Sequence, residues 1–427
     1  MKHFRSGLVA GALALGTAFA TLTPAWAQEL PRGDATALGF DPDRLARMDA
    51  TFGALVDKGM TPGAVLMLIR DGQIAHLSTM GKRTPDGEPM TEDTLFRIYS
   101  MTKPITSVAA MMLVEEGKLL LNAPVSTYLP AYKTLTVVTG EKDAEGKPVT
   151  RPAKGVMTVR DLMRHTSGLT YGFFGAGPAR EAYNAAGVAS PENTAIEQAN
   201  LMASLPLEHD PGTTWEYSRA TDVLGAVVEV ASGQTLEEFM KARIFDPLGM
   251  EDTAFYIDDA ADFPRIAEPF ADQAKLGSRD VFDPRVRKPN QSGGGGLMST
   301  VHDYAKFAQM MLNGGELNGT RLLSPKSVQL MTSNHLEGIK PGKYYLPGPG
   351  YGFGLGYGVR LDTGNAPSMG SAGEYNWGGA AGTGYHADPA EDMIALLMIQ
   401  SPANRGPLRL IFKNLAFSTL ADSRVDD

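Results

Sequence analysis

Cysteine is absent from this sequence of 427 residues. Its absence excludes disulfide bonds and a thiol nucleophile, so packing of the core has to hold the fold together. The seven histidines are scattered along the chain, and no two have the spacing of metal ligands on a helix. The sequence therefore predicts no bound metal and no other cofactor.

A Gly-x-Ser-x-Gly motif is also missing, and so is any long apolar run after residue 27. The first absence excludes the nucleophile elbow of the α/β-hydrolases. The second predicts a chain with no membrane span once its first residues are removed. Basic residues number 39 against 48 acidic ones, and the formal net charge of −9 argues against nucleic acid as a partner.

The first 27 residues have the layout of a secretory signal peptide. Lys2 and Arg5 precede an apolar stretch over residues 8–22, and Ala25-Trp26-Ala27 supplies small residues at a cleavage site. A mature protein that begins near Gln28 would be periplasmic or secreted, and with no cysteine there it would carry no lipid anchor. Cleavage removes both basic residues and takes the net charge from −9 to −11.

Both ends of the mature chain are patterned for a sheet. Residues 63–70 and 73–80 are predicted strands joined by Asp71-Gly72, a dipeptide suited to a tight hairpin turn, and residues 41–58 form an amphipathic helix before them. The other expected elements are strands over 351–361, 378–389 and 392–400 and a closing helix over 408–420. Helical patterns dominate between the two ends and are broken by polar loops such as residues 140–155.

This arrangement predicts an α+β fold, in which an antiparallel sheet is flanked by N- and C-terminal helices and carries a mostly helical insertion. We expect the sheet domain to comprise residues 28–106 and 284–427, and the helical domain residues 107–283. The catalytic cleft should lie between them. No oligomeric state is predicted.

Ser100 and Lys103 form the only Ser-x-x-Lys in the sequence. Apolar residues follow them at helical spacing, Pro104 is tolerated only in a first helical turn, and Gly117 is placed to end the helix. Ser100 should therefore lie at a helix N-terminus with Lys103 one turn further on, on the same face. A lysine can activate a serine in this way, but an N-cap serine beside a solvated lysine would give the same pattern.

Two further segments could bring chemistry to Ser100. Tyr217 lies on a loop just before an apolar helix, where it could face a cleft or fill a domain interface. Trp377-Gly378-Gly379-Ala380 is predicted to open a strand, and paired glycines there let a ligand or another backbone come close. An ordinary turn would also explain these glycines, so each segment alone is weak evidence for a site.

Together the three motifs resemble those of the β-lactamase and penicillin-binding-protein superfamily, in which Ser-x-x-Lys, a tyrosine-containing loop and a Lys-Thr-Gly-type strand occur in this order. The resemblance spans nearly the whole mature chain and implies a β-lactamase/transpeptidase-like fold. It includes the segments FRIYSMTKPITS, LMRHTSGL, DPGTTWEYS and SGGGGLMST. The chain looks most like the class C branch and is most similar to the family VIII carboxylesterases, which share its Tyr-Ser and Trp-Gly-Gly.

The resemblance implies a catalytic role for four residues. Ser100 would be the acylated nucleophile, and Lys103 its proton acceptor. Tyr217 would protonate the leaving group and later activate water, and either Lys103 or Tyr217 could be the principal base. The backbone N–H groups of Ser100 and Ala380 would form the oxyanion hole.

Substrate binding would fall to Trp377, Gly378, Gly379 and Arg219. Trp377 stands where the β-lactam-processing enzymes carry a lysine that pairs with the substrate carboxylate, and an indole offers apolar area and one N–H donor instead. Arg219 occupies the slot of an asparagine that contacts substrate in β-lactamases. The expected wall of the acyl pocket consists of Tyr171, Phe173 and Phe174.

Two conspicuous segments are interpreted as structural. His165-Thr166-Ser167-Gly168 would be a loop after a helix capped by Thr158 and Asp161 and stopped by Gly168, rather than a catalytic Ser-His pair. Residues 293–296, four glycines, lack the lysine and helix of a phosphate loop and favour close backbone packing.

The function that these residues favour is hydrolysis of short to medium carboxylic esters by a serine hydrolase with a small-molecule substrate. Two alternatives stay open. A β-lactamase or D-Ala-directed peptidase of the class C type would share the acyl-enzyme chemistry. A catalytically silent binding protein could keep the fold without the reaction.

Overall fold

The computed structural model describes Met1 and residues 29–85, 87–277 and 279–425. The predicted signal peptide lies outside these residues apart from Met1. No helix in the described ranges is both long and apolar enough to cross a membrane.

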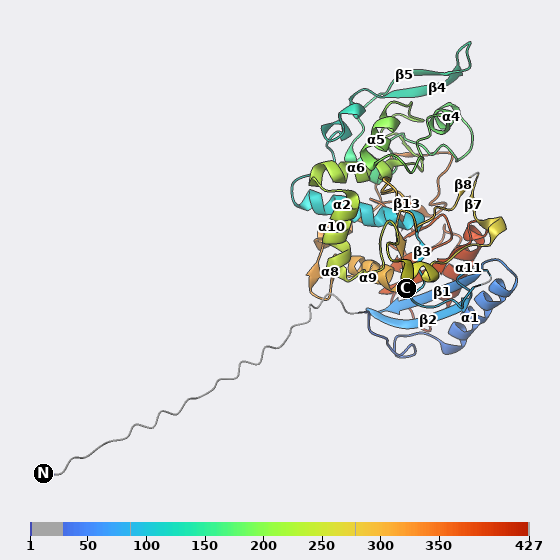
Figure 1. The fold of residues 1–427 in the computed structure, drawn as a ribbon. Helices are drawn as coiled ribbons and strands as arrows, with labels where there is room; N and C mark the ends of the chain where they lie inside the picture. The colour runs from blue at the N-terminus through green and yellow to red at the C-terminus, as the bar shows by residue number, and fades with distance from the viewer. Residues whose placement is uncertain (2–28, 86, 278, 426–427) are drawn as a thin grey trace.

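A seven-stranded antiparallel sheet is built from both ends of the chain (Figure 1). The strand order is β13-β14-β15-β16-β17-β1-β2, so the C-terminal strand β17 pairs with the N-terminal strand β1. The strands are β1 (Gly63–Arg70), β2 (Gln73–Gly81), β13 (Tyr351–Phe353), β14 (Gly358–Arg360), β15 (Tyr375–Gly378), β16 (Gly384–Asp388) and β17 (Met393–Ile399). This sheet confirms the predicted α+β class.

The β1–β2 hairpin confirms the turn predicted at Asp71-Gly72. Both residues have positive φ, 56° and 70°. A two-residue type I′ turn requires positive φ at both central positions, and its twist matches that of the flanking strands.

Helices cover both faces of the sheet. On one face α1 (Pro42–Asp57) and α11 (Arg405–Ser418) pack on β1 and β17 through a core cluster that includes Phe52, Leu66, Leu397 and Phe412. On the other face α9 (Val301–Leu312) packs against β16 and β17. Strands β1 and β17 are buried along their whole length, which explains why both are continuous apolar runs in the sequence.

The residues between the two ends form most of the other helices, with α4, α5 and α6 at the end of the molecule far from β1 and β2 (Figure 1). The α-helices from α2 to α10, apart from α9, are α2 (Thr102–Glu115), α3 (Val159–Met163), α4 (Pro178–Ala185), α5 (Ala195–Ala203), α6 (Ala220–Ser232), α7 (Leu236–Met240), α8 (Asp246–Leu248) and α10 (Pro325–Met331). Helix α2 packs on α6 and α7, and it is buried from Thr102 to Leu113.

Short strands tie the loops together in pairs. They are β3 (Phe96–Arg97) with β9 (Met298–Ser299), β6 (Thr214–Trp215) with β12 (Lys340–Pro341), β7 (Lys275–Leu276) with β8 (Arg279–Asp280), and β10 (Glu316–Leu317) with β11 (Thr320–Arg321). Strand β3 comes shortly before Ser100 in the chain, and strand β6 shortly before Tyr217.

Two local expectations were wrong. Residues 140–155, predicted as a loop, belong largely to a hairpin of β4 (Thr136–Lys142) and β5 (Pro148–Pro152). Most residues of this hairpin are exposed, so the sequence shows no alternation of apolar and polar residues that would have predicted the strands. The strand predicted over 351–361 is two strands, β13 and β14. Gly356 turns the chain between them with φ 102°, and a Cβ there would lie 2.5 Å from Ser107 Oγ on α2.

Candidate active site

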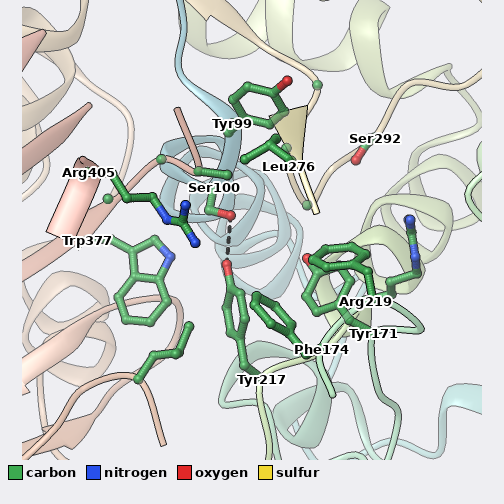
Figure 2. A pocket seen from close by; sticks show the side chains of 18 of the residues that line it. Tyr99, Ser100, Tyr171, Phe174, Tyr217, Arg219, Leu276, Ser292, Trp377 and Arg405 are labelled. Carbon is green, nitrogen blue, oxygen red and sulfur yellow. Dashed lines mark hydrogen bonds between the residues drawn. The ribbon is translucent and has the colours of Figure 1, made fainter. Parts of the chain in front are cut away.

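A cavity of about 1020 Å³ is lined by residues from both ends of the chain and from the helical region between them. Its lining includes the segment 377–380 and, as Figure 2 shows, Ser100 and Tyr217. Lys103 is fully buried and contacts Ser100. The structure therefore brings all three sequence motifs to one place.

Ser100 is presented by a turn of 3₁₀ helix, Tyr99–Met101, that leads directly into α2. Tyr99 has φ 42°, which is unusual for a residue with a side chain. Its phenol accepts a hydrogen bond from the Phe282 N–H at 3.2 Å, and burial raises the pKa of Tyr99 to about 12. The half-buried side chain of Tyr99 thus anchors the backbone that carries Ser100.

Lys103 donates three hydrogen bonds, to Ser100 Oγ at 3.2 Å, to Tyr171 Oη at 3.1 Å and to the Gly294 carbonyl at 2.5 Å. Burial alone would lower the pKa of Lys103, but the oxygens of Tyr171 and Tyr217 and the carboxylate of Asp222 hold it above its ordinary value. An ammonium group has three donors and no acceptor, which suits this set of partners. In the resting site Lys103 is therefore a cation.

Tyr217 donates a hydrogen bond of 2.7 Å to Ser100 Oγ (Figure 2). Its ring is packed among other rings, with centroids 4.9 Å away for His165, 5.3 Å for Tyr171 and 5.6 Å for Trp377. These contacts fix the ring, so the phenol oxygen is held against Ser100 Oγ.

The ring of His165 packs against the ring of Tyr217. Its ring is buried, and its Nδ1 lies 3.3 Å from Ser218 Oγ. Burial, reinforced by the charge of Lys103, holds its pKa well below the usual range, so the ring is neutral. The predicted capping box of Thr158 and Asp161 is present.

The helix that this box begins, α3, ends at Met163. Gly168 therefore does not stop it, contrary to the prediction. Gly168 is instead a site of close approach, since a Cβ there would lie 2.0 Å from the His209 carbonyl oxygen.

Trp377 and Gly378 close β15 rather than open a strand, which corrects the prediction. Gly379 follows, and a Cβ on it would lie 2.3 Å from the carbonyl oxygen of Ile98. Only glycine lets this backbone come so near the turn that carries Ser100. Ser100 and Ala380 both line the cavity, and neither backbone N–H has an acceptor among the residues described.

The four glycines at 293–296 support close packing, as expected. A Cβ on Gly293 would lie 2.7 Å from the Thr221 carbonyl oxygen on α6. The Gly294 N–H donates to Asp222 Oδ1 at 3.1 Å while its carbonyl accepts from Lys103. The loop therefore connects α6 to the lysine beside the nucleophile.

Comparison with known proteins places this arrangement in a family. The model of the family described as Beta-lactamase matches residues 48–416. The chain belongs to the β-lactamase family. It is 38% identical to the protein Rv1367c of Mycobacterium tuberculosis over 82% of this chain and 88% of that protein. It is 32% identical to Esterase EstB of Burkholderia gladioli over 90% of this chain and 98% of the esterase.

Solved structures agree with this assignment. EstCE1, described as a hydrolase with promiscuous acyltransferase activity, has a TM-score of 0.72 and 27% identity over 88% of this chain and 99% of its own. The chain is thus a serine hydrolase with the β-lactamase fold, related to the family VIII esterases.

Sequence reasoning missed two cations of this β-lactamase-family site. Arg405 and Arg409, in the first turns of α11, line the cavity beside Trp377, and Arg405 extends toward Ser100 in Figure 2. Burial, together with the nearby charge of Arg405, lowers the pKa of Arg409 to about 10. In the described part of the chain neither pairs with a carboxylate within 4 Å. Their spacing of four on one helix face was the only signal for them.

Arg219 also lines the cavity, but it turns away from Ser100 (Figure 2). Its guanidinium lies 5.4 Å from the ring centroid of Tyr171, and its Nη1 is 3.3 Å from Asp222 Oδ2. The predicted aromatic wall is formed by Tyr171, Phe173 and Phe174, whose rings contact one another. No group of three or more potential metal ligands converges anywhere in the described ranges.

Proposed function

We propose that this protein hydrolyses carboxylic esters of small molecules through an acyl-enzyme on Ser100. The observation that carries the proposal is the contact of Ser100 Oγ with both Tyr217 Oη, at 2.7 Å, and Lys103 Nζ, at 3.2 Å. A serine hydroxyl becomes nucleophilic when a neighbouring group takes its proton as it attacks. Tyr217 and Lys103 both lie within hydrogen-bond distance of Ser100 Oγ, and Lys103 carries a positive charge.

Tyr217 is the better proton acceptor of the two, because Lys103 is held as a cation. The Lys103–Tyr217 pair has to lose one proton before it can act as a base, and the charge of Lys103 then stabilises a phenolate on Tyr217. Lys103 Nζ lies 4.8 Å from the Tyr217 ring centroid, close enough for this interaction. The role of Lys103 is therefore electrostatic, and that of Tyr217 is proton transfer.

In the first half of the reaction Ser100 Oγ bonds to the ester carbonyl carbon and its proton moves to Tyr217. The carbonyl oxygen takes the negative charge and accepts hydrogen bonds from the N–H groups of Ser100 and Ala380. The bond to the alcohol oxygen then breaks, and that oxygen takes the proton from Tyr217. In the second half water attacks the acyl-enzyme, Tyr217 accepts its proton, and Ser100 regains it as the acid leaves.

Acyl transfer to an alcohol is a second candidate, favoured by the size of the cavity. Its 1020 Å³ matches the upper range for sites that hold drug-sized ligands, so an acyl group and an alcohol could be held together. The alcohol would then replace water in the second half of the reaction.

Because residues 1–27 have the layout of a signal peptide, we place either reaction in the periplasm or outside the cell.

Ser100→Ala tests this proposal directly. The variant should lose p-nitrophenyl butyrate hydrolysis by several orders of magnitude and should no longer be labelled by a fluorophosphonate probe. Its circular dichroism spectrum and Tm should match those of the wild type. Near-normal turnover by Ser100→Ala would overturn the assignment of the nucleophile.

A further inference from the structure

Beyond Tyr171 the cavity reaches two arginines that stack on neighbouring aromatic rings. Arg219, which begins α6, lies with its Cζ 5.4 Å from the Tyr171 ring centroid, and Arg279 of β8 lies with its Cζ 5.7 Å from that of Phe173. The two ring centroids are 4.8 Å apart. All four residues and Ser100 line the same cavity.

The positive charge of this pair is only partly neutralised. Asp222 pairs with Arg219 at 3.3 Å, but its Oδ1 already accepts from the Ser292 hydroxyl at 2.5 Å and from the Gly294 N–H at 3.1 Å. Arg219 is only 8% exposed, and its Nε has no hydrogen-bond acceptor among the residues described. Two guanidinium groups therefore share at most one carboxylate oxygen.

The Arg279 side chain makes neither a hydrogen bond nor an ion pair within the described ranges. Burial lowers the pKa of Arg279, and the positive charge of Arg219 lowers it further. Two other carboxylates line the cavity. Asp280 makes no ion pair with either arginine within 4 Å in the described ranges, and Asp283 is paired with Arg285 at 2.9 Å.

We propose that Arg219 and Arg279 form a subsite for an anionic group at the far end of the acyl chain, so that the preferred substrates are half-esters of dicarboxylic acids. A carboxylate placed between the two side chains would accept charge-assisted hydrogen bonds from both guanidinium groups, and such bonds are about twice as strong as those between neutral groups. Stacking on Tyr171 and Phe173 fixes both guanidinium planes in advance.

The acyl side of the substrate is the one that reaches this subsite. Tyr171 Oη is 3.1 Å from Lys103 Nζ, which contacts Ser100 Oγ, so one aromatic side chain separates the subsite from the nucleophile. The alcohol has to leave next to Tyr217, and in Figure 2 Trp377 and Arg405 lie across Tyr217 from Tyr171 and Arg219. This inference rests on the acyl-enzyme mechanism proposed above.

The test compares p-nitrophenyl esters that differ only in the end of the acyl chain. Hemiglutarate and valerate have the same number of carbon atoms, as do hemisuccinate and butyrate, and one member of each pair is anionic. In at least one pair, the wild type should have a higher kcat/KM for the anionic ester than for the neutral ester of the same length. Arg279→Met should lower that value about tenfold or more, as expected for one charge-assisted contact, and change the neutral ester about twofold at most.

Two further variants sharpen the result. Arg279→Lys keeps the charge and should retain part of the preference, whereas Lys288→Met removes a cavity-lining cation that is already paired with Glu192 at 2.8 Å and should leave it intact. Equal losses for both esters in Arg279→Met, or no preference in the wild type, would overturn the subsite.

Failure of the mechanism would look different from failure of the subsite. If the mechanism fails, the wild type hydrolyses neither ester through Ser100 and a fluorophosphonate leaves it unlabelled. If only the subsite fails, the wild type is labelled and turns over valerate without discriminating against it. An effect of Arg279→Met confined to esters with an anionic alcohol would also refute the acyl assignment.

Discussion

Tyr217 Oη lies 2.7 Å from Ser100 Oγ, although 117 residues separate the two in the sequence. The contact joins the loop before α6 to the 3₁₀ turn that leads into α2, and these two helices pack against each other. In the proposed mechanism, the Ser100 proton moves along this short hydrogen bond once Tyr217 has lost its own proton, and the backbone does not need to rearrange.

Tyr217→Phe should keep substrate binding and lose turnover, because it removes only the oxygen that moves the proton. General acid–base catalysis typically contributes about 10²–10⁴-fold, and kcat should fall by a factor in that range while KM changes little. Lys103→Ala should act similarly, and the double variant should lose far less than the product of the two because the pair works as one unit. Unchanged kcat in Tyr217→Phe would reduce Tyr217 to a packing residue.

Gly379→Ala should disable the oxyanion hole while leaving Ser100 and Tyr217 in place. The added Cβ would meet both the Ile98 carbonyl oxygen and Thr383 Oγ1 at 2.3 Å, so the backbone at Ala380 has to move. Loss of one oxyanion donor costs about 10²–10³-fold in kcat. Gly53→Ala in α1, where a Cβ meets nothing within 4 Å, is the matched control and should retain full kcat. Equal activity of the two variants would refute this account.

Glu374 should stabilise the fold in a pH-dependent way. It is fully buried, and its carboxylate contacts Lys413 Nζ at 2.6 Å and His386 Nδ1 at 2.8 Å. Burial alone would raise the pKa of Glu374, but His386 and Lys413 lower it from 4.5 to about 2. A lowered pKa adds stability that is complete above pH 4.5 and is lost as the pH falls toward 2, here about 3 kcal/mol by order of magnitude.

Glu374→Gln should therefore lower the urea midpoint most at pH 7 and by a smaller amount at pH 3.5, where about 2 kcal/mol of the contribution remains, as followed by circular dichroism. Glu145→Gln, at the exposed tip of the β4–β5 hairpin, is the control and should change little at either pH. A penalty for Glu374→Gln that grows toward low pH would have the wrong sign for this mechanism.

Esters should be better substrates than β-lactams. Trp377 replaces the lysine expected for a β-lactam carboxylate, and a charge-assisted hydrogen bond of that kind is worth about 1.5–3 kcal/mol. We expect kcat/KM for p-nitrophenyl butyrate to lie well above that for a chromogenic cephalosporin. Because Arg405 provides a cation beside Trp377, Arg405→Ala should reduce any cephalosporin turnover more than ester turnover. A cephalosporin turned over as fast as the best ester would contradict this ranking.

The sequence determined the elements whose signals are local. Helix α2 is defined by the apolar spacing after Ser100, by Pro104 in its first turn and by Gly117 after its last turn. In the structure it begins at Thr102 and ends at Glu115. Asp71-Gly72 defines the β1–β2 turn in the same way, because the required φ values depend on the residues themselves. The order of the three motifs also sufficed to predict the family.

Only the tertiary structure decided what surrounds the nucleophile. The charge of Lys103 depends on the Gly294 carbonyl, Tyr171 and Asp222, which come from three separate segments. Arg279 and Arg405 reach the cavity from a hairpin and a helix that carry no recognisable motif. Such contacts form between residues far apart in the chain, so neither periodicity nor turn chemistry encodes them, and burial and electrostatics at the assembled site determine their effect.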